Sequence, residues 1–187
     1  MMSGSLRRNW PYALTGLLAI ATIASGWIMR NHFAPVGPGT VAPEFTAVDL
    51  EGREVSLSEL RGEVVLLNIW ATWCPPCREE MPSMQRLHEQ LGSEGLRIVA
   101  VSIDAGSGLL DRGGRKGGNV RAFVREHELT FDIWHDPKGE IQRVFQTTGV
   151  PESFVIDRNG LIVRKVAGAT EWDAEAYVEL FRRLLNE

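Results

Sequence analysis

The sequence predicts an α/β domain with a central mixed sheet flanked by helices, preceded by one apolar helix. Three observations support this prediction. Runs of β-branched and aliphatic residues alternate with segments of helical periodicity, the chain closes with a strand–turn–strand–helix pattern, and a long uncharged segment stands near the N-terminus. A chain of 187 residues has room for one domain of about 150 residues and a short additional segment.

The composition is that of an ordinary globular protein and gives no support to nucleic-acid binding. Hydrophobic residues make up 44% of the chain and charged residues 24%, with a net charge of −4 and a pI of about 5.6. Proteins that bind nucleic acids need a basic surface for the phosphates. We therefore expect no nucleic-acid partner.

A run of 20 residues without a charge, Trp10–Met29, lies near the N-terminus. As an α-helix it would be about 30 Å long, which matches the hydrocarbon core of a bilayer. Arg7 and Arg8 precede it, and the positive-inside rule keeps such a basic end in the cytoplasm. Because Ala19-Ile20-Ala21 resembles a cleavage site, a removed signal peptide stays open as the alternative. Whether the run is a membrane anchor or a signal peptide, the rest of the chain is predicted to be exported.

The chain is therefore predicted to be a single-pass protein of the cell membrane with a periplasmic or otherwise extracytoplasmic domain. A Pro- and Gly-rich stretch separates the apolar run from the rest. The predicted parts are a cytoplasmic tail over residues 1–9, a transmembrane anchor or signal-anchor over residues 10–29, a linker over residues 30–42 and the α/β domain over residues 43–187.

The domain is predicted to begin with a β-hairpin extension, followed by a strand–helix–strand unit. Glu51-Gly52 is a turn signal between two short β-rich runs. Val64–Trp70 is almost wholly apolar, as expected of a strand covered on both faces. The other elements are the hairpin strands Glu44–Leu50 and Arg53–Leu57, the helix Pro75–Leu91 and the buried strand Leu96–Ile103.

A Gly-rich stretch, Ala105–Gly118, follows this second buried strand. Asn119–His127 then has a helical pattern, and Asn119 is a suitable N-cap residue. Phe131–Trp134 is a short apolar piece, and Lys138–Thr147 is predicted to be a short helix.

The chain closes with a predicted hairpin and a last helix. Ser153–Ile156 and Leu161–Val166 are predicted strands because Asn159-Gly160 signals a tight turn. Thr170 and Asp173 resemble a capping box that would open the last helix. Its apolar side is predicted to carry Trp172, Ala176, Tyr177, Leu180, Phe181 and Leu184. A βαβ unit followed by ββα is a thioredoxin-like arrangement.

The two cysteines of the chain, Cys74 and Cys77, lie between a predicted buried strand and a predicted helix. A thiolate at a helix N-terminus meets unpaired backbone N–H groups and the positive end of the helix dipole, so the pKa of Cys74 should fall below its ordinary value of about 8.5. Cys77 follows one turn later and can attack a mixed disulfide on Cys74. Pro75 and Pro76 fit early helix positions, where a missing N–H costs little. The pattern predicts a redox-active disulfide, Cys74–Cys77, and no other cofactor.

Two other interpretations of the cysteine pair stay open. A structural disulfide would constrain the unfolded chain little, because the loop that it closes is so short. A copper or zinc site would need further ligands. No second CxxC exists, and the histidines are scattered singly at His32, His88, His127 and His135.

Over Val41–Glu187 the chain resembles the TlpA/ResA/CcmG branch of the thioredoxin superfamily, which are membrane-tethered, extracytoplasmic thiol reductases. The resemblance rests on Asn68–Pro82 (NIWATWCPPCREEMP) and Gly149–Asp157 (GVPESFVID). It implies that Pro151 is cis and faces the disulfide. It also implies that Val150 offers backbone hydrogen bonds to an extended substrate peptide.

The resemblance assigns a proton-exchanging role to Glu80. Cytoplasmic thioredoxins have a buried aspartate six residues before the first cysteine, and this chain has Asn68 there, which cannot titrate. Glu80 comes three residues after Cys77. Burial beside an apolar site would raise the pKa of its carboxyl and suit it to exchange a proton with Cys77. The alternative is a solvated helix residue like Glu79.

Glu152, two tryptophans and the Gly-rich stretch are further candidates for the site. Glu152 matches the proline-glutamate pair of the CcmG group, where the acid lies near the site, although a surface glutamate is the alternative. Trp73, beside Pro75 and Pro76, is expected to line the substrate-binding surface, whereas Trp70 is a candidate for the core. The Gly-rich stretch exceeds the usual connection of the family and is expected to be a tolerated surface insertion or to touch substrate.

The predicted function is thiol–disulfide exchange with protein substrates outside the cytoplasm. The resemblance implies reduction of the haem-binding cysteines of apocytochrome c, with a membrane thiol transporter as the electron donor. Two alternatives come from other classes of function. One is a copper or zinc chaperone that uses Cys74 and Cys77 as ligands, and the other is a non-catalytic tethered binding module with a structural disulfide.

Overall fold

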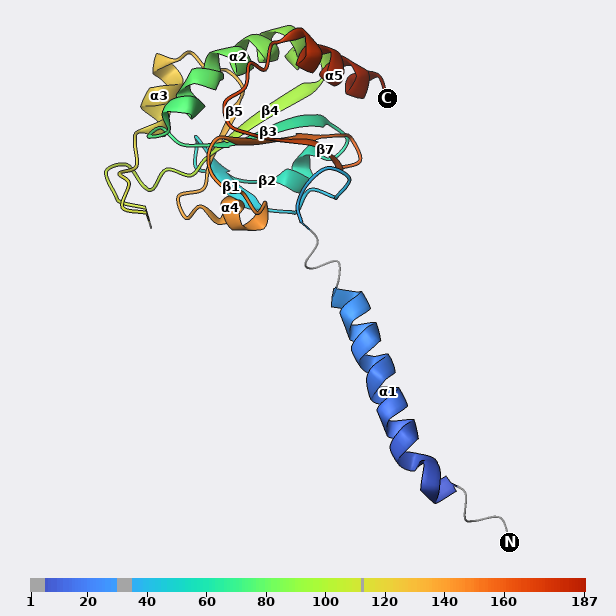
Figure 1. Ribbon diagram of the computed structural model, residues 1–187. Coiled ribbons are helices and arrows are strands. Elements are labelled where there is room, and N and C mark those ends of the chain that lie inside the picture. Colours follow the sequence, from blue (N-terminus) through green and yellow to red (C-terminus); the bar gives the residue numbers. More distant parts are fainter. Residues whose placement is uncertain (1–5, 30–34, 112) are drawn as a thin grey trace. The chain divides into compact units, whose positions relative to one another are not determined.

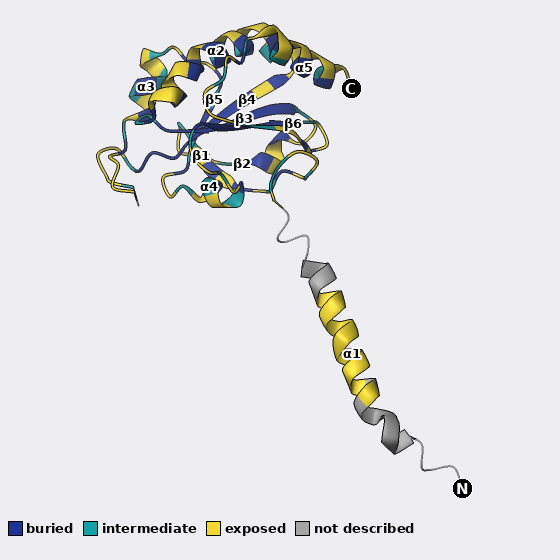
Figure 2. Ribbon diagram, viewed as in Figure 1, coloured by how far each residue is buried: buried dark blue, intermediate teal, exposed yellow. Residues whose placement is uncertain are grey.

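The computed structural model describes residues 6–29, 35–111 and 113–187. The chain forms two compact units, Met1–Pro35 and Val36–Glu187. The first contains one helix, α1 (Leu6–Met29), whose described side chains are exposed (Figures 1 and 2). Within the described ranges, no helix has both the length and the apolar character needed to cross a membrane. Residues 1–5 of the predicted tail and residues 30–34 of the predicted linker lie outside the described residues.

The second unit is built on a seven-stranded mixed sheet with the order β2-β1-β5-β4-β3-β6-β7 (Figure 1). β3, β4 and β5 are parallel to one another, and all other neighbours in the sheet are antiparallel. The strands are β1 (Thr46–Asp49), β2 (Glu54–Ser56), β3 (Val64–Trp70), β4 (Leu96–Ser102), β5 (Asp132–His135), β6 (Glu152–Ile156) and β7 (Ile162–Ala167).

Helices cover both faces of this sheet. In Figure 1, α2, α3 and α5 lie on one face, whereas α4 lies on the other. Two short 3-10 helices, Leu57–Leu60 and Gly92–Glu94, follow β2 and α2. The α-helices of this unit are α2 (Pro75–Leu91), α3 (Val120–Glu126), α4 (Glu140–Val144) and α5 (Glu175–Asn186).

The core lies around the two central strands. Every residue of β3 is buried, and in β4 only Arg97 is exposed (Figure 2). Both strands have strands on either side and helices above or below, so their apolar side chains face protein in both directions. Trp70, the last residue of β3, is fully buried and belongs to the core. The carboxyl ends of β3 and β4 lead into the loops that form the site.

The predicted order of elements is confirmed, with one strand missing from it. β3 and α2 have the predicted bounds, and Asn119 caps α3 through a hydrogen bond from the backbone N–H of Ala122. The predicted apolar piece is a strand, β5, which joins the N-terminal hairpin to β4. Its four residues were too few to show a period.

The predicted capping box of the last helix is wrong. α5 begins at Glu175, after Ala174, which makes no side-chain cap. Thr170 and Asp173 are engaged elsewhere, because the Thr170 N–H points to Glu80 and Asp173 pairs with Arg86. Trp172 therefore precedes the helix, although it is fully buried, and Val178 rather than Ala176 faces the core.

The globular unit also begins earlier than its first strand. Gly39 and Ala42 donate backbone hydrogen bonds to Ile162 and Gly160, and Val41 forms a β-bridge with Leu161. The end of the segment assigned to the linker is thus hydrogen-bonded to the chain around β7.

Candidate active site

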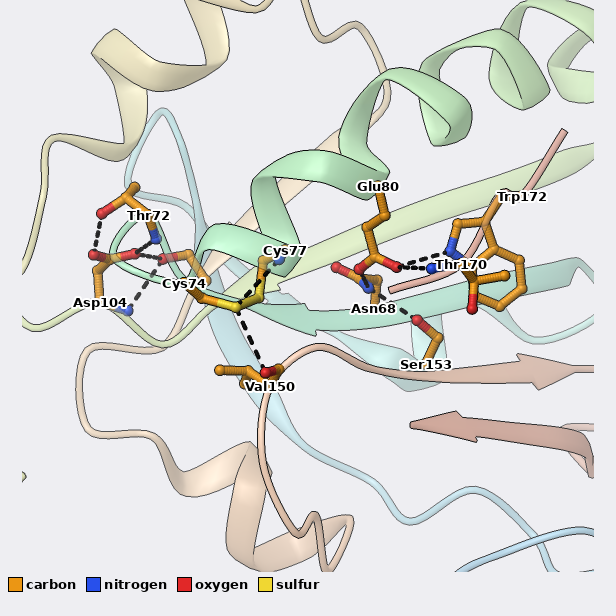
Figure 3. The surroundings of a disulfide bond; sticks show 11 residues. Asn68, Thr72, Cys74, Cys77, Glu80, Asp104, Val150, Ser153, Thr170 and Trp172 are labelled. Carbon is orange, nitrogen blue, oxygen red and sulfur yellow. Dashed lines mark hydrogen bonds between the residues drawn. A yellow bond between two sulfur atoms is a disulfide. The ribbon is translucent and has the colours of Figure 1, made fainter. Parts of the chain in front are cut away.

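Cys74 and Cys77 form a disulfide at the N-terminus of α2 (Figure 3). Cys74 is the N-cap residue, and its Sγ accepts a hydrogen bond of 3.2 Å from the backbone N–H of Cys77. Pro75 and Pro76 occupy the first two helical positions, where no intrahelical N–H bond is lost. This geometry directs the Cys77 N–H and the positive end of the helix dipole at the Cys74 sulfur, where they stabilise negative charge.

The loop before β6 faces the disulfide from the other side. The Val150–Pro151 peptide bond is cis, as the resemblance implies. The Val150 carbonyl oxygen lies 3.5 Å from Cys74 Sγ (Figure 3). The chain thus brings together two segments that are 76 residues apart. An open backbone at this place can pair with an extended peptide as an added strand would.

Glu80 lies on the next turn of α2 and is 1% exposed, so it is not a solvated residue, unlike Glu79. Its carboxylate accepts hydrogen bonds from Asn68 Nδ2 at 2.7 Å, Trp172 Nε1 at 3.2 Å and the Thr170 N–H at 3.3 Å (Figure 3). Burial raises the pKa of the Glu80 carboxyl to about 7, although these three donors act to lower it. Glu80 can therefore gain or lose a proton near neutral pH.

Asn68, which replaces the aspartate of cytoplasmic thioredoxins, is part of the same buried cluster. Its amide nitrogen donates to Glu80 and also to Ser153 Oγ at 2.9 Å. Its Oδ1 has no hydrogen-bond partner among the described residues. The position that titrates in cytoplasmic thioredoxins here holds a neutral donor that orients the titrating group.

Glu152 is 2% exposed, and the alternative of a surface glutamate is wrong. Its carboxylate accepts a hydrogen bond of 2.9 Å from the Thr148 N–H and forms an ion pair of 3.2 Å with Lys165. The bond to Thr148 joins the chain on the two sides of the cis peptide bond, and the ion pair with Lys165 joins it to β7. Among the contacts of the described residues, none joins Glu152 to a cysteine.

Asp104, a buried carboxylate in addition to Glu80 and Glu152, was not identified in the sequence. It follows β4, is fully buried, and accepts hydrogen bonds from the Thr72 N–H at 2.8 Å and the Thr72 hydroxyl at 2.5 Å. It also accepts hydrogen bonds from Ser102 Oγ at 2.8 Å and from the Gly118 N–H at 2.9 Å. Asp104 thus fixes the loop that carries Cys74 to the end of the Gly-rich stretch (Figure 3). An aspartate directly after a buried parallel strand, at the sheet edge where Cys74 is found, was the available signal.

The Gly-rich stretch is packed onto the loop before Cys74. A Cβ on Gly118 would lie 2.2 Å from Thr72 Oγ1, and one on Gly117 would lie 2.0 Å from the Ala105 carbonyl oxygen, so both positions require glycine. The Arg115 guanidinium lies 3.8 Å from the ring centroid of Trp73. Trp73 is half-buried beside the disulfide, and one face of its ring is covered by this arginine.

The described part of the chain contains no group of three or more His, Cys, Asp or Glu side chains that could hold a metal ion. His88 packs edge-on against Phe131, and His127 packs against Phe123 with the rings tilted. His135 Nε2 contacts the Asp104 carbonyl at 2.8 Å. The histidines described are thus engaged in packing and in a loop contact.

A CxxC disulfide at the start of the helix that follows the central strand, facing a cis-proline loop, defines a thiol–disulfide oxidoreductase of the thioredoxin fold. A sequence model described as the AhpC/TSA family matches residues 38–165. The chain belongs to this family.

Known relatives agree with this class. Thiol-disulfide oxidoreductase ResA of Bacillus thuringiensis subsp. konkukian is 33% identical over 159 residues, covering 84% of this chain and 85% of the relative. Thioredoxin-like protein YneN of Bacillus subtilis is 34% identical over 154 residues, covering 80% and 85%. The predicted resemblance to ResA-type proteins is confirmed.

Solved structures agree as well. The crystal structure of a protein described as thiol:disulfide interchange protein DsbE from Chlorobium tepidum superposes with a TM-score of 0.67 at 33% identity, covering 79% of this chain and 97% of that one. StoA from Bacillus subtilis gives a TM-score of 0.57 at 26% identity, covering 77% and 97%. The chain is thus a thiol–disulfide oxidoreductase with a CxxC active-site pair.

Proposed function

We propose that this protein reduces disulfides of exported proteins, such as the haem-binding cysteines of apocytochrome c, and is recharged by a membrane thiol transporter. The observation that carries the proposal is the position of Cys74 at the start of α2, 3.5 Å from the Val150 carbonyl oxygen. A substrate strand that pairs with this backbone would bring its disulfide to Cys74. The family resemblance supports the direction of the reaction.

In the proposed reaction the reduced protein carries two thiols. The Cys74 thiolate attacks one sulfur of the substrate disulfide, and the other substrate sulfur leaves as a thiolate that takes up a proton. Cys77 then loses its proton and attacks Cys74 Sγ, which releases the second substrate thiol. Two electrons pass to the substrate, and the Cys74–Cys77 disulfide is left. Cys77 is fully buried, which suits it to the internal step.

Glu80 is proposed to take the proton from Cys77. A carboxyl whose pKa is raised to about 7 accepts and returns protons at neutral pH more readily than an ordinary glutamate. It belongs to the same helix as Cys77, three residues further on. Its three donors hold the carboxylate in one orientation.

The remaining residues are proposed to bind the substrate chain. Val150 offers its backbone, Pro151 keeps the disulfide accessible, and Trp73, Pro75 and Pro76 form the apolar surface beside it. Glu152 acts by positioning, since its contacts with Thr148 and Lys165 hold the ends of this loop.

We also propose that the uncharged run Trp10–Met29 anchors the domain outside the cytoplasm. The proposal rests on the sequence of this run and on the resemblance, and not on the described helix, which lacks the combination of length and apolar character that a span requires. Fractionation should find the full-length chain in the membrane, with its C-terminal domain open to external protease. A soluble product that begins near residue 22 would contradict this proposal.

The reaction is tested by trapping. Cys77→Ser should accumulate a mixed disulfide with substrate through Cys74, whereas Cys74→Ser should not. Trapping by Cys74→Ser instead would reverse the two roles. An inert Cys74 thiol in the reduced protein would support a structural disulfide, and metal that copurifies under reducing conditions would support a metal chaperone. A reduction potential well below the roughly −120 mV of a strong oxidant would support a reductase.

A further inference from the structure

A groove runs between the Gly-rich stretch and the segment that leads into α4, and Arg115, which contacts Trp73, is one of its lining residues. Its volume is about 300 Å³. One wall comes from the insertion and the other from the start of α4, and Ile103, the residue after β4, also lines the groove. Its lining residues include Leu110, Asp111, Arg115, Pro137, Lys138 and Gln142.

The insertion wall is fixed to the active-site loop by two independent contacts. Arg115 stacks on Trp73, the residue before Cys74, at 3.8 Å. Gly118, at the end of the insertion, donates to Asp104, which also binds Thr72. A polypeptide lying in the groove would therefore lie beside a wall whose position is coupled to that of Cys74.

The groove carries positive charge that the protein itself leaves partly uncompensated. Arg115 pairs with Asp111 through Nε at 2.9 Å, and its side chain is 50% exposed. Asp111 is further satisfied by the backbone N–H groups of Gly113 and Arg115. Lys138 is exposed and has no ion-pair partner among the described residues. Leu110, 67% exposed, adds apolar surface to the same wall.

We propose that this groove binds a segment of the substrate polypeptide that carries acidic side chains near the disulfide attacked by Cys74. The proposal rests on the proposed function and extends it to a class of substrate. Lys138 and Arg115 supply charge complementarity, and Leu110 contacts the apolar part of the segment. Because the chain as a whole carries a net charge of −4, this local cationic site has to act at short range.

The test uses two disulfide-bonded peptides that differ only in having Glu or Gln on both sides of the disulfide. At low ionic strength the reduced full-length protein in detergent should reduce the Glu peptide with a kcat/KM about threefold higher, the size expected of one exposed charge pair. Lys138→Gln should abolish the preference and Lys138→Glu should reverse it. High salt should weaken the preference of the wild-type protein.

Arg182→Glu is the matched control, because Arg182 is an exposed cation of α5 outside the site. It should keep the wild-type preference. Equal turnover of both peptides by the wild-type protein, an unchanged preference in Lys138→Glu or the same loss in Arg182→Glu would overturn the groove proposal. A neutral small disulfide separates the two proposals, since its reduction by the wild-type protein supports the proposed function whatever the peptides show. No turnover of any disulfide would overturn both.

Discussion

Two buried carboxylates, Asp104 and Glu80, lie on the two sides of the Cys74–Cys77 disulfide (Figure 3). They differ in the kind of groups that donate hydrogen bonds to them. Asp104 accepts four hydrogen bonds, two of them from the backbone of loops on either side of it. Glu80 accepts three, two of them from the side chains of Asn68 and Trp172. Asp104 connects two loops through its hydrogen bonds. Glu80 has a pKa of about 7, because burial raises the pKa more than its three hydrogen-bond donors lower it.

Burial alone does not assign a role to a carboxylate. The hydrogen-bond partners of the carboxylate decide its role. Removing Asp104 would leave backbone N–H groups of two loops without partners, so its loss should appear as lost stability. Removing the charge of Glu80 leaves its neighbours in place, so its loss should appear in the dependence on pH.

The largest expected effect is that of Asp104→Ala. The Thr72 and Gly118 N–H groups lose their acceptor, and we expect the free energy of unfolding to fall by about 4 kcal/mol, since each unpaired buried group costs about 1–3 kcal/mol. Urea unfolding of the oxidised protein measures this. Asp132→Ala, which removes a partly exposed ion pair with Arg97, should cost less than about 1 kcal/mol. Equal losses of unfolding free energy in Asp104→Ala and Asp132→Ala would show that Asp104 does not hold the two loops together.

The second effect concerns Glu80 and has a defined sign. The pKa of this carboxyl is raised in the folded protein to about 7 from its ordinary 4.5, so the folded state holds the proton more tightly. The stability from this proton is complete below pH 4.5 and is lost as pH rises through 7. The loss should amount to about 3 kcal/mol.

Glu80→Gln should remove this part of the pH dependence, and Glu79→Gln, at an exposed neighbour, should leave it. Unfolding midpoints of the oxidised proteins between pH 4.5 and 8.5 measure the difference. If wild type and Glu80→Gln lose stability in parallel, the proton is not held by Glu80.

A smaller effect is expected from Asn68→Ala. The Asn68 amide donates to Glu80 at 2.7 Å and so favours the ionised carboxylate. Its removal should raise the pKa of Glu80 further, by about one unit. The chemical shift of the labelled Glu80 carboxyl carbon follows the titration. Ser153→Ala, which leaves the Asn68–Glu80 contact intact, should have no such effect, and a lowered pKa in Asn68→Ala would contradict the role of this donor.

The sequence predicted most of the fold because its buried strands and α2 are long and strongly patterned. β3 and α2 were bounded correctly, and the burial of Glu80 followed from its place in a resembling motif. β5 was missed because a strand of four residues shows no period. The last helix was predicted to begin too early in the chain. Thr170 and Asp173 are residue types that cap helices, but here they bind Glu80 and Arg86 of α2 instead.

The site was predictable where residues are adjacent in sequence and not where loops meet. Cys74, Cys77 and Glu80 lie within one helical segment, so their spacing is informative. The contact of Arg115 with Trp73 and the bonds of Asp104 to Thr72 and Gly118 depend on how the Gly-rich stretch folds back. No periodicity encodes that path, and an aspartate after a strand is a weak signal by itself.

The pH dependence of thiol alkylation tests whether Glu80 exchanges a proton with the active-site thiols, as we propose. In the reduced wild-type protein the rate should follow a linked titration of carboxyl and thiols, because a nearby carboxylate disfavours thiolate. In Glu80→Gln the rate profile should move to lower pH and lose the linked step, while Glu79→Gln should match the wild type. Superimposable profiles for wild type and Glu80→Gln would show that Glu80 does not exchange a proton with these thiols.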